Sequence, residues 1–171
     1  MACPSVGLST EPAFTRFVYY KLLTLVPVSA ALTALIRYGE SLLWPALYLG
    51  LCLGHAAVMN AAKCPHCPYY KLGDRTFGCF IWWGAPKLWA EREGPEAAWV
   101  GRYAMFGMAV LAFFPVYWLW QELPLLVIYL LGIGGLVLSI GLNECSRCLN
   151  FECGHCTVPE ELRQEYRQTL V

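Results

Sequence analysis

Four long apolar runs constrain what this 171-residue chain can fold into. Each run has about the 20 residues that an α-helix needs to cross the hydrocarbon core of a bilayer. Apolar residues make up 58% of the chain and charged residues 14%, against roughly 45–50% and about 25% in soluble domains. The sequence therefore predicts an all-α integral membrane protein, a four-helix bundle in a lipid bilayer. The predicted spans are Phe17–Ile36, Leu42–Ala62, Tyr103–Trp120 and Leu123–Asn143.

The distribution of basic residues predicts which side of the membrane the loops occupy. An even number of spans places both termini and the loop at 63–102 on one side. All but one of the twelve Lys and Arg residues lie at or near this face, the exception being Arg37. Because basic residues favour the cytoplasmic side, we expect an inner or cytoplasmic membrane protein with cytoplasmic N- and C-termini. The expected domains are a transmembrane domain over 1–143, which includes the cap loop, and a cysteine-rich cytoplasmic tail with a short C-terminal helix over 144–171.

The cysteines gather in the segments predicted for that face. The stretch CSRCLNFECGHC follows the fourth run, and CPHC follows the second. A C-x2-C turn directs two thiolates toward one point, as tetrahedral zinc and iron–sulfur sites require. In a reducing cytoplasm, clustered thiols more often bind metal or do redox work than form structural disulfides. The expected ligands are the six paired cysteines, with one further cysteine and two histidines as second choices: Cys64, Cys67, Cys145, Cys148, Cys153, Cys156, Cys79, His66 and His155.

The sequence leaves both the pairing and the metal open. In one arrangement the pairs at 64–67 and 145–148 share an ion, while Cys79, the pair at 153–156 and a histidine hold a second. In the other, the tail segment alone binds one ion with its four cysteines. Zinc is slightly favoured, as a structural clamp between loop and tail. An iron–sulfur cluster would make the protein an electron carrier at the membrane surface, although the ferredoxin spacing C-x2-C-x2-C-x3-C-P is absent.

Two tetrapeptides support an alternative function. CPHC at 64–67 and CGHC at 153–156 are similar to the active-site tetrapeptides of thioredoxin-fold disulfide oxidases and isomerases. A four-helix membrane protein with cysteine pairs at one face also resembles the quinone-linked disulfide oxidases and vitamin K epoxide reductases. These resemblances imply a membrane thiol–disulfide oxidoreductase. The predicted cytoplasmic side argues against that function, because such enzymes work in an oxidising compartment.

The second run carries soft-metal ligands within the predicted membrane. Cys52, His55 and Met59 follow at i, i+3 and i+7, so they share one helix face. The face predicts either a heme or soft-metal site, which would suit a mercury or copper transporter, or a packed helix interface with one hydrogen-bonded histidine. We favour the packed interface, because His55 is the only histidine in any predicted span.

Small residues predict where helices approach closely. Gly50 and Gly54 form one small-xxx-small pair, and Gly135 with Ser139 forms another. Such pairs let the backbones of two membrane helices come together. We therefore expect helix contacts at both places.

Several function classes lack support in this sequence. The formal net charge of +0 gives no electrostatic reason to expect nucleic-acid binding. A C-x-x-C-H motif is absent, which excludes c-type heme. Glycine-rich phosphate loops, H-E-x-x-H and serine nucleophile motifs are also absent, and whether the chain is an enzyme stays open. The tail and the aromatic loop offer a surface to a protein partner at the cytoplasmic face, but the sequence identifies neither a partner nor an oligomeric state.

Overall fold

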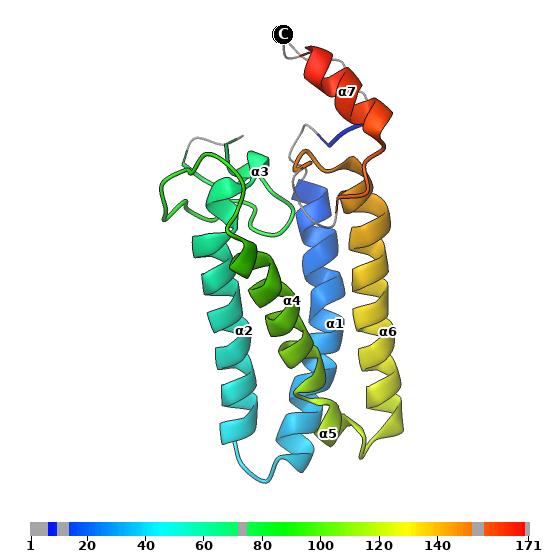
Figure 1. Ribbon diagram of the computed structural model, residues 1–171. Helices are drawn as coiled ribbons and strands as arrows, with labels where there is room; N and C mark the ends of the chain where they lie inside the picture. The colour runs from blue at the N-terminus through cyan, green and yellow to red at the C-terminus, as the bar shows by residue number, and fades with distance from the viewer. Residues whose placement is uncertain (1–6, 10–13, 72–74, 152–155, 170–171) are drawn as a thin grey trace.

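The structure, a computed structural model, describes residues 7–9, 14–71, 75–151 and 156–169. Within these ranges the chain is helical, and no β-strand occurs apart from an isolated bridge between Thr76 and Pro86. The long helices run between two ends of the molecule (Figure 1). The elements are α1 (Phe14–Tyr38), α2 (Leu43–Ala62), η1 (Cys64–His66), α3 (Pro68–Lys71), α4 (Ala98–Phe113), α5 (Val116–Leu119), α6 (Leu123–Ser139), η2 (Ile140–Glu144), η3 (Cys145–Arg147) and α7 (Glu160–Thr169).

The four predicted apolar helices are present. The helical stretches long and apolar enough to cross a membrane are Phe14–Tyr38, Leu43–His66, Ala98–Leu119 and Leu123–Arg147. The third is divided at Pro115, since α4 ends at Phe113 and α5 begins at Val116. Proline cannot donate the backbone hydrogen bond that would continue the helix. The fourth continues through the π-helical turn η2 and the 3-10 turn η3 into the cysteine segment.

The long helices pack closely where a glycine faces a bulky ring. The ring of Pro27 in α1 lies against Gly132 in α6, with its Cδ 2.9 Å from where a Cβ would stand. In the same way, the imidazole of His55 in α2 occupies the space that a Cβ of Gly107 in α4 would need. The ring of Tyr103 stacks on that imidazole with centroids 5.5 Å apart. The absence of a side chain at Gly132 and at Gly107 therefore permits close packing of α1 on α6 and of α2 on α4.

The helix contact expected at the second small-xxx-small pair occurs at Ser139 and not at Gly135. The Tyr20 hydroxyl of α1 donates to the Ser139 carbonyl over 3.2 Å, and the Tyr19 hydroxyl lies 3.2 Å from the Ser139 hydroxyl. A Cβ added at Gly50, Gly54 or Gly135 would have no described atom within 4 Å. The close approach expected at Gly50 and Gly54 is therefore not found among the described residues.

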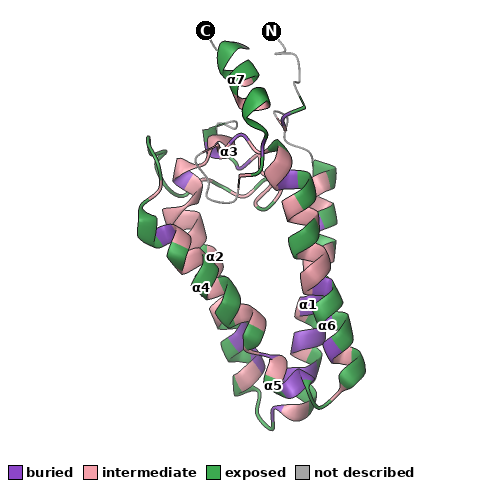
Figure 2. Ribbon diagram, turned by 45° about the vertical axis from the view of Figure 1, so that its right-hand side comes forward, coloured by how far each residue is buried: buried purple, intermediate pink, exposed green. Residues whose placement is uncertain are grey.

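The main hydrophobic core lies near the α5 end of the bundle, where Figure 2 shows most of the buried helical residues. Beyond Tyr48, α2 has no buried residue within its bounds, and α4 buries only Val100. The helices are thus packed closely at the α5 end, whereas most side chains of α2 and α4 toward the other end are partly or fully exposed. The buried core residues are Ala30, Ala31, Ala34, Leu35, Tyr48, Trp118, Leu119, Leu126 and Tyr129.

The opposite end, which we call the cap end, gathers segments that are distant in the sequence. It contains η1, α3, the loop at 75–97, the segment at 145–151 and α7 (Figure 1). The backbone N–H of Ser9 donates to the carbonyl of Arg147 over 2.9 Å, which ties the chain before α1 to the chain after α6. A second apolar cluster of Leu8, Leu149 and Val158 lies here. Both cysteine segments therefore reach the same end of the bundle.

Candidate functional site

The two C-x2-C turns at the cap end have nearly the same backbone. η1 begins at Cys64, directly after α2, and η3 begins at Cys145, after η2. Cys67 has φ −80° and ψ 133°, and Cys148 has φ −76° and ψ 135°. The residue before each turn also has matching angles. Two segments that share little besides their cysteine spacing thus adopt one conformation, with the second cysteine in an extended position.

The second sulfur of each turn lies near a backbone N–H two residues further along the chain. The N–H of Tyr69 near the Sγ of Cys67 opposes the rise in the pKa of that thiol. The Sγ of Cys148 accepts a hydrogen bond from the backbone N–H of Asn150, over 3.4 Å. Backbone hydrogen bonds of this kind stabilise a thiolate and tune metal–sulfur sites.

A third sulfur comes from the loop at 75–97. The Sγ of Cys79 accepts a hydrogen bond from the backbone N–H of Trp82 over 3.3 Å. The amine of Lys21 lies 5.4 Å from the ring centroid of Trp82 and 5.5 Å from that of Phe17, within electrostatic range of the Cys79 thiol. The amine of Lys63 is likewise within electrostatic range of the Cys64 thiol. Positive charges thus accompany two of the sulfurs, which favours their ionised form.

Four thiols from three segments lie in one region of the cap end. Cys64 is near Cys67 and Cys79, and Cys67 is near Cys79 and Cys148, close enough for each thiol to raise the pKa of its neighbour. Within the described part of the chain, no group of three or more His, Cys, Asp or Glu side chains has an arrangement that could hold a metal ion. The thiols are therefore neighbours that do not yet converge on one point.

Burial controls the chemistry of these thiols. Burial, together with the nearby thiols of Cys148 and Cys79, raises the pKa of Cys67 to about 12. Burial also raises the pKa of Cys79, although backbone N–H donors and Lys21 oppose the shift. Without a bound cation, such thiols stay protonated at neutral pH and are poor nucleophiles. A coordinated metal ion would reverse this, because it deprotonates the thiols that bind it.

His66 has a partner in the neighbouring loop. Its Nδ1 lies 3.1 Å from the carbonyl oxygen of Gly94. The backbone N–H of Arg92 donates to the carbonyl of Pro65 over 3.1 Å, so this stretch of loop lies along η1. The structure thus joins His66 to the loop before α4, and its Nδ1 is occupied there.

Of the remaining tail ligands, Cys145 and Cys156 are described. The backbone N–H of Thr157 donates to the carbonyl of Cys145 over 3.3 Å, which brings the adjacent Cys156 close to η3. Cys153 and His155 lie outside the described residues. A second metal centre in the tail stays a prediction. The seven described cysteines form no disulfide bond.

The soft-ligand face predicted within α2 is divided between two environments. The Cys52 side chain packs against the main core, which contains Tyr48 one turn earlier in α2. The imidazole of His55 packs on Gly107, and its buried Nδ1 has no hydrogen-bond partner among the described residues. Met59 is half-buried one turn further on. The favoured packed interface is present, but the hydrogen bond expected for His55 is not found at its Nδ1.

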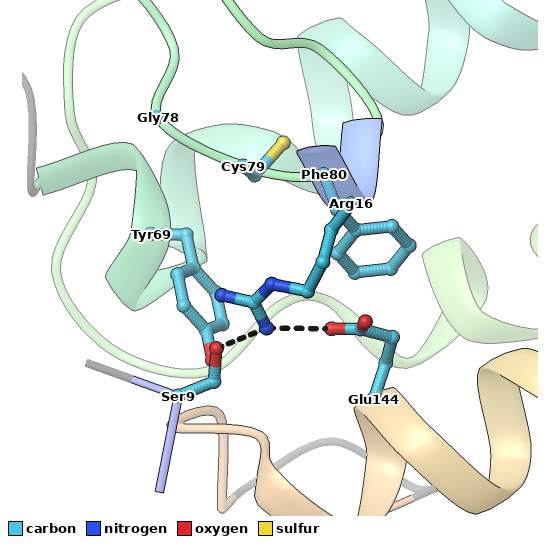
Figure 3. Close-up of a pocket in the computed structure, with 7 residues that line it drawn as sticks. All are labelled: Ser9, Arg16, Tyr69, Gly78, Cys79, Phe80 and Glu144. Atoms are coloured by element: carbon cyan, nitrogen blue, oxygen red, sulfur yellow. Dashed lines mark hydrogen bonds and ion pairs between the residues drawn. The ribbon is translucent and has the colours of Figure 1, made fainter. Parts of the chain in front are cut away.

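A polar pocket beneath the thiols was missed by the sequence analysis. Figure 3 shows Arg16 between Ser9 and Glu144, with the Cys79 sulfur pointing away from this group. The Arg16 guanidinium donates to the Ser9 hydroxyl and, over 3.2 Å, to the Glu144 carboxylate. Opposite charges at the cap-side ends of the first and fourth apolar runs were the available signal. The pocket is lined by Ser9, Arg16, Tyr69, Gly78, Cys79, Phe80 and Glu144.

The site as a whole is a set of buried thiols supplied with backbone donors, nearby lysines and a polar network. These features suit coordination of a thiophilic cation better than exchange chemistry at an ionised thiol. Known proteins offer no family assignment: no family model, curated protein or solved structure matches this chain.

Proposed function

We propose that this chain is a polytopic membrane metalloprotein whose cap binds a metal ion through Cys64, Cys67, Cys79 and Cys148. The observation that carries the proposal is the gathering of these four thiols from three distant segments. The ligand set takes Cys79 in place of Cys145, because Cys79 is near both thiols of the first turn. Rotation of the cysteine side chains would have to close the remaining gaps between the sulfurs.

Zn²⁺ is the proposed ion. Four thiolates form a closed tetrahedral shell with Zn–S distances of about 2.3 Å, which is typical of structural zinc sites. A Zn²⁺ ion with four thiolates carries two net negative charges. Lys63 and Lys21, which approach Cys64 and Cys79, offset that charge. The ion would join the ends of α2 and α6 through the loop between α3 and α4.

The proposed placement is a membrane with the cap on the cytoplasmic side. Four apolar helices of sufficient length support membrane insertion. The concentration of Lys and Arg on the cap side supports the cytoplasmic orientation. In that compartment the thiols would stay reduced, which keeps them available to a metal.

The test is metal analysis of the full-length protein purified in detergent under reducing, anaerobic conditions. We expect bound zinc that Cys67→Ser or Cys148→Ser lowers by one equivalent per chain. Cys52→Ser is the matched control, because Cys52 belongs to the main core and lies outside the proposed ligand set. It should keep the full zinc content.

Two other results would replace this proposal. Iron and sulfide with visible absorption, lost in Cys67→Ser, would place an iron–sulfur cluster at the same thiols and make electron transfer the function. Absence of any metal, together with a thiol count that changes reversibly with redox potential, would overturn the metal site in favour of the disulfide oxidoreductase.

A further inference from the structure

Tyr69 contacts both cysteine turns of the cap. Its backbone N–H lies near the Sγ of Cys67, two residues earlier in the chain. Its hydroxyl accepts a hydrogen bond, over 3.3 Å, from the backbone N–H of Leu149. Leu149 directly follows Cys148 and is buried, with 7% of its surface exposed. One residue therefore links the first turn, through its backbone, to the second turn, through its side chain.

The Tyr69 side chain lines the polar pocket. Its hydroxyl lies beside the side chain of Ser9, to which the Arg16 guanidinium donates a hydrogen bond. Arg16 also binds Glu144, which precedes η3. Figure 3 shows Tyr69 and Ser9 approaching each other beside the Arg16–Glu144 pair. The hydroxyl thus lies beside a polar network that joins α1 to the end of α6.

We propose that Tyr69 is a positioning residue that holds Cys148 beside Cys67, so that sulfurs from separate segments can share one ion. The proposal rests on the metal-binding function above and adds the residue that assembles the ligand set. The hydroxyl makes a hydrogen bond that a phenylalanine ring cannot replace. Without it, the Leu149 N–H loses its partner, and the chain at 148–150 loses its link to the first turn. Loss of an outer hydrogen bond at a metal site typically weakens binding about 10–100-fold.

The test compares Tyr69→Phe with Tyr70→Phe. Tyr70 lies in the same helical turn and is buried, but its hydroxyl donates to the carbonyl of Trp89 in the loop. Both variants lose one phenolic hydroxyl and keep the ring, so they are matched in size and location. Only Tyr69→Phe removes the link to Leu149.

The first measurement is a Co²⁺ titration of the full-length protein, with competition by Zn²⁺. Thiolate-to-cobalt charge-transfer absorption reports how many sulfurs bind. We expect Tyr69→Phe to bind about 10–100-fold more weakly and to show the reduced charge-transfer intensity of Cys148→Ser. Tyr70→Phe should match the unmodified protein in affinity and in spectrum.

The second measurement does not need a metal site. In metal-free protein carrying Cys64→Ser and Cys79→Ser, copper phenanthroline oxidises neighbouring thiols, and mass spectrometry quantifies the disulfide between Cys67 and Cys148. We expect Tyr69→Phe, but not Tyr70→Phe, to lower its yield several-fold.

The two measurements separate the positioning role from the metal site itself. A chain that binds no Co²⁺ through thiols fails the proposed function, while the cross-linking yield still decides the role of Tyr69. Unchanged cross-linking in Tyr69→Phe overturns the positioning role. An equal loss in Tyr70→Phe also overturns it, because the effect would then be general loosening of the cap.

Discussion

The two ends of the bundle are held together by different kinds of contact. At the α5 end, rings from several helices meet: Trp44 and Trp118 lie 5.0 Å apart between centroids, and Tyr48 stacks on Phe114 at 5.8 Å. At the cap end, the segments are joined mainly by hydrogen bonds, ion pairs and a group of thiols, beside the small apolar cluster of Leu8, Leu149 and Val158. The hydrogen bond between Tyr69 and Leu149 is typical of these contacts.

This difference predicts that the stabilities of the two ends respond differently to solution conditions. Close packing of apolar side chains does not change with protonation, ionic strength or metal supply. The ion pairs of the cap respond to salt, and the proposed metal site would make the cap depend on pH and metal supply as well. We therefore expect the packing at the α5 end to stay the same over a range of solution conditions, and the stability of the cap end to change with them.

The largest expected effect is that of metal removal, which should act on the cap end alone. Structural zinc sites in small peptides contribute about 10–16 kcal/mol at neutral pH. We expect a chelator to increase hydrogen exchange at the Leu149 and Trp82 amides by orders of magnitude. The amides of α5 should be unaffected. Equal deprotection at both ends would show that the ends are one cooperative unit.

Alkaline pH should act on the metal-free cap in the same selective way. The folded-state pKa of Cys67 is raised from 9.0 to about 12. Because the raised value favours the neutral thiol in the folded state, its stabilising effect is complete below pH 9 and is lost between about pH 9 and 12. Exchange at cap amides should rise over this range, whereas the metal-loaded cap should resist it up to a higher pH.

Truncation of Tyr129 should damage the α5 end and spare the metal site. Tyr129 is 1% exposed, and its hydroxyl donates to the carbonyl of Ala112 over 2.7 Å. Replacing a buried aromatic side chain with alanine typically costs about 3–5 kcal/mol. We expect Tyr129→Ala to lower the unfolding midpoint in detergent strongly, with the metal content of the remaining folded protein unchanged. A loss of metal in the folded fraction would contradict the separation of the two ends.

The ion pairs at the two ends should differ in strength. Arg16–Glu144 at the cap is largely buried, with 31% and 8% of the side chains exposed, whereas Arg37–Glu122 at the other end has 59% and 26% exposed. Hydrogen bonds to charged groups contribute about 1.5–3 kcal/mol, and exposed ion pairs about 0.2–1 kcal/mol. Glu144→Gln should therefore destabilise the protein more than Glu122→Gln. Thermal unfolding of both variants at low and high salt would measure this, and the reverse order would refute it.

The smallest effect concerns the pairing of α2 with α4, between the two ends. A Cβ at Gly107 would overlap the His55 imidazole, and overpacking of this kind costs about 1–3 kcal/mol. Gly50 has no described atom within 4 Å of such a Cβ, so Gly50→Ala is the matched control and should be neutral or slightly stabilising. Equal unfolding midpoints for Gly107→Ala and Gly50→Ala would show that α2 and α4 are not held together at this position.

The helices and the cap could be predicted from the sequence to different extents. Long apolar runs define helices without reference to the rest of the chain, and an even number of them brings the turns at Cys64 and Cys145 to one end. The proposed ligand Cys79 was only a second choice, because the loop that carries it has no periodic pattern. The role proposed for Tyr69 depends on a hydrogen bond to Leu149, 80 positions away, and sequence spacing carries no signal for such a contact.

Because the core lies at one end of α2, a small tilt of this helix moves its other end by a larger distance. Tyr48 is the last buried residue of α2, and at 1.5 Å per residue Cys64 lies about 24 Å beyond it. A tilt of about 3° therefore moves the turn that carries Cys64 by about 1 Å. Zinc–sulfur bonds tolerate only about 0.2 Å. Membrane helices tilt to match the thickness of the bilayer around them. If the proposed site is correct, the composition of the host lipid therefore enters directly into how tightly the ion is retained.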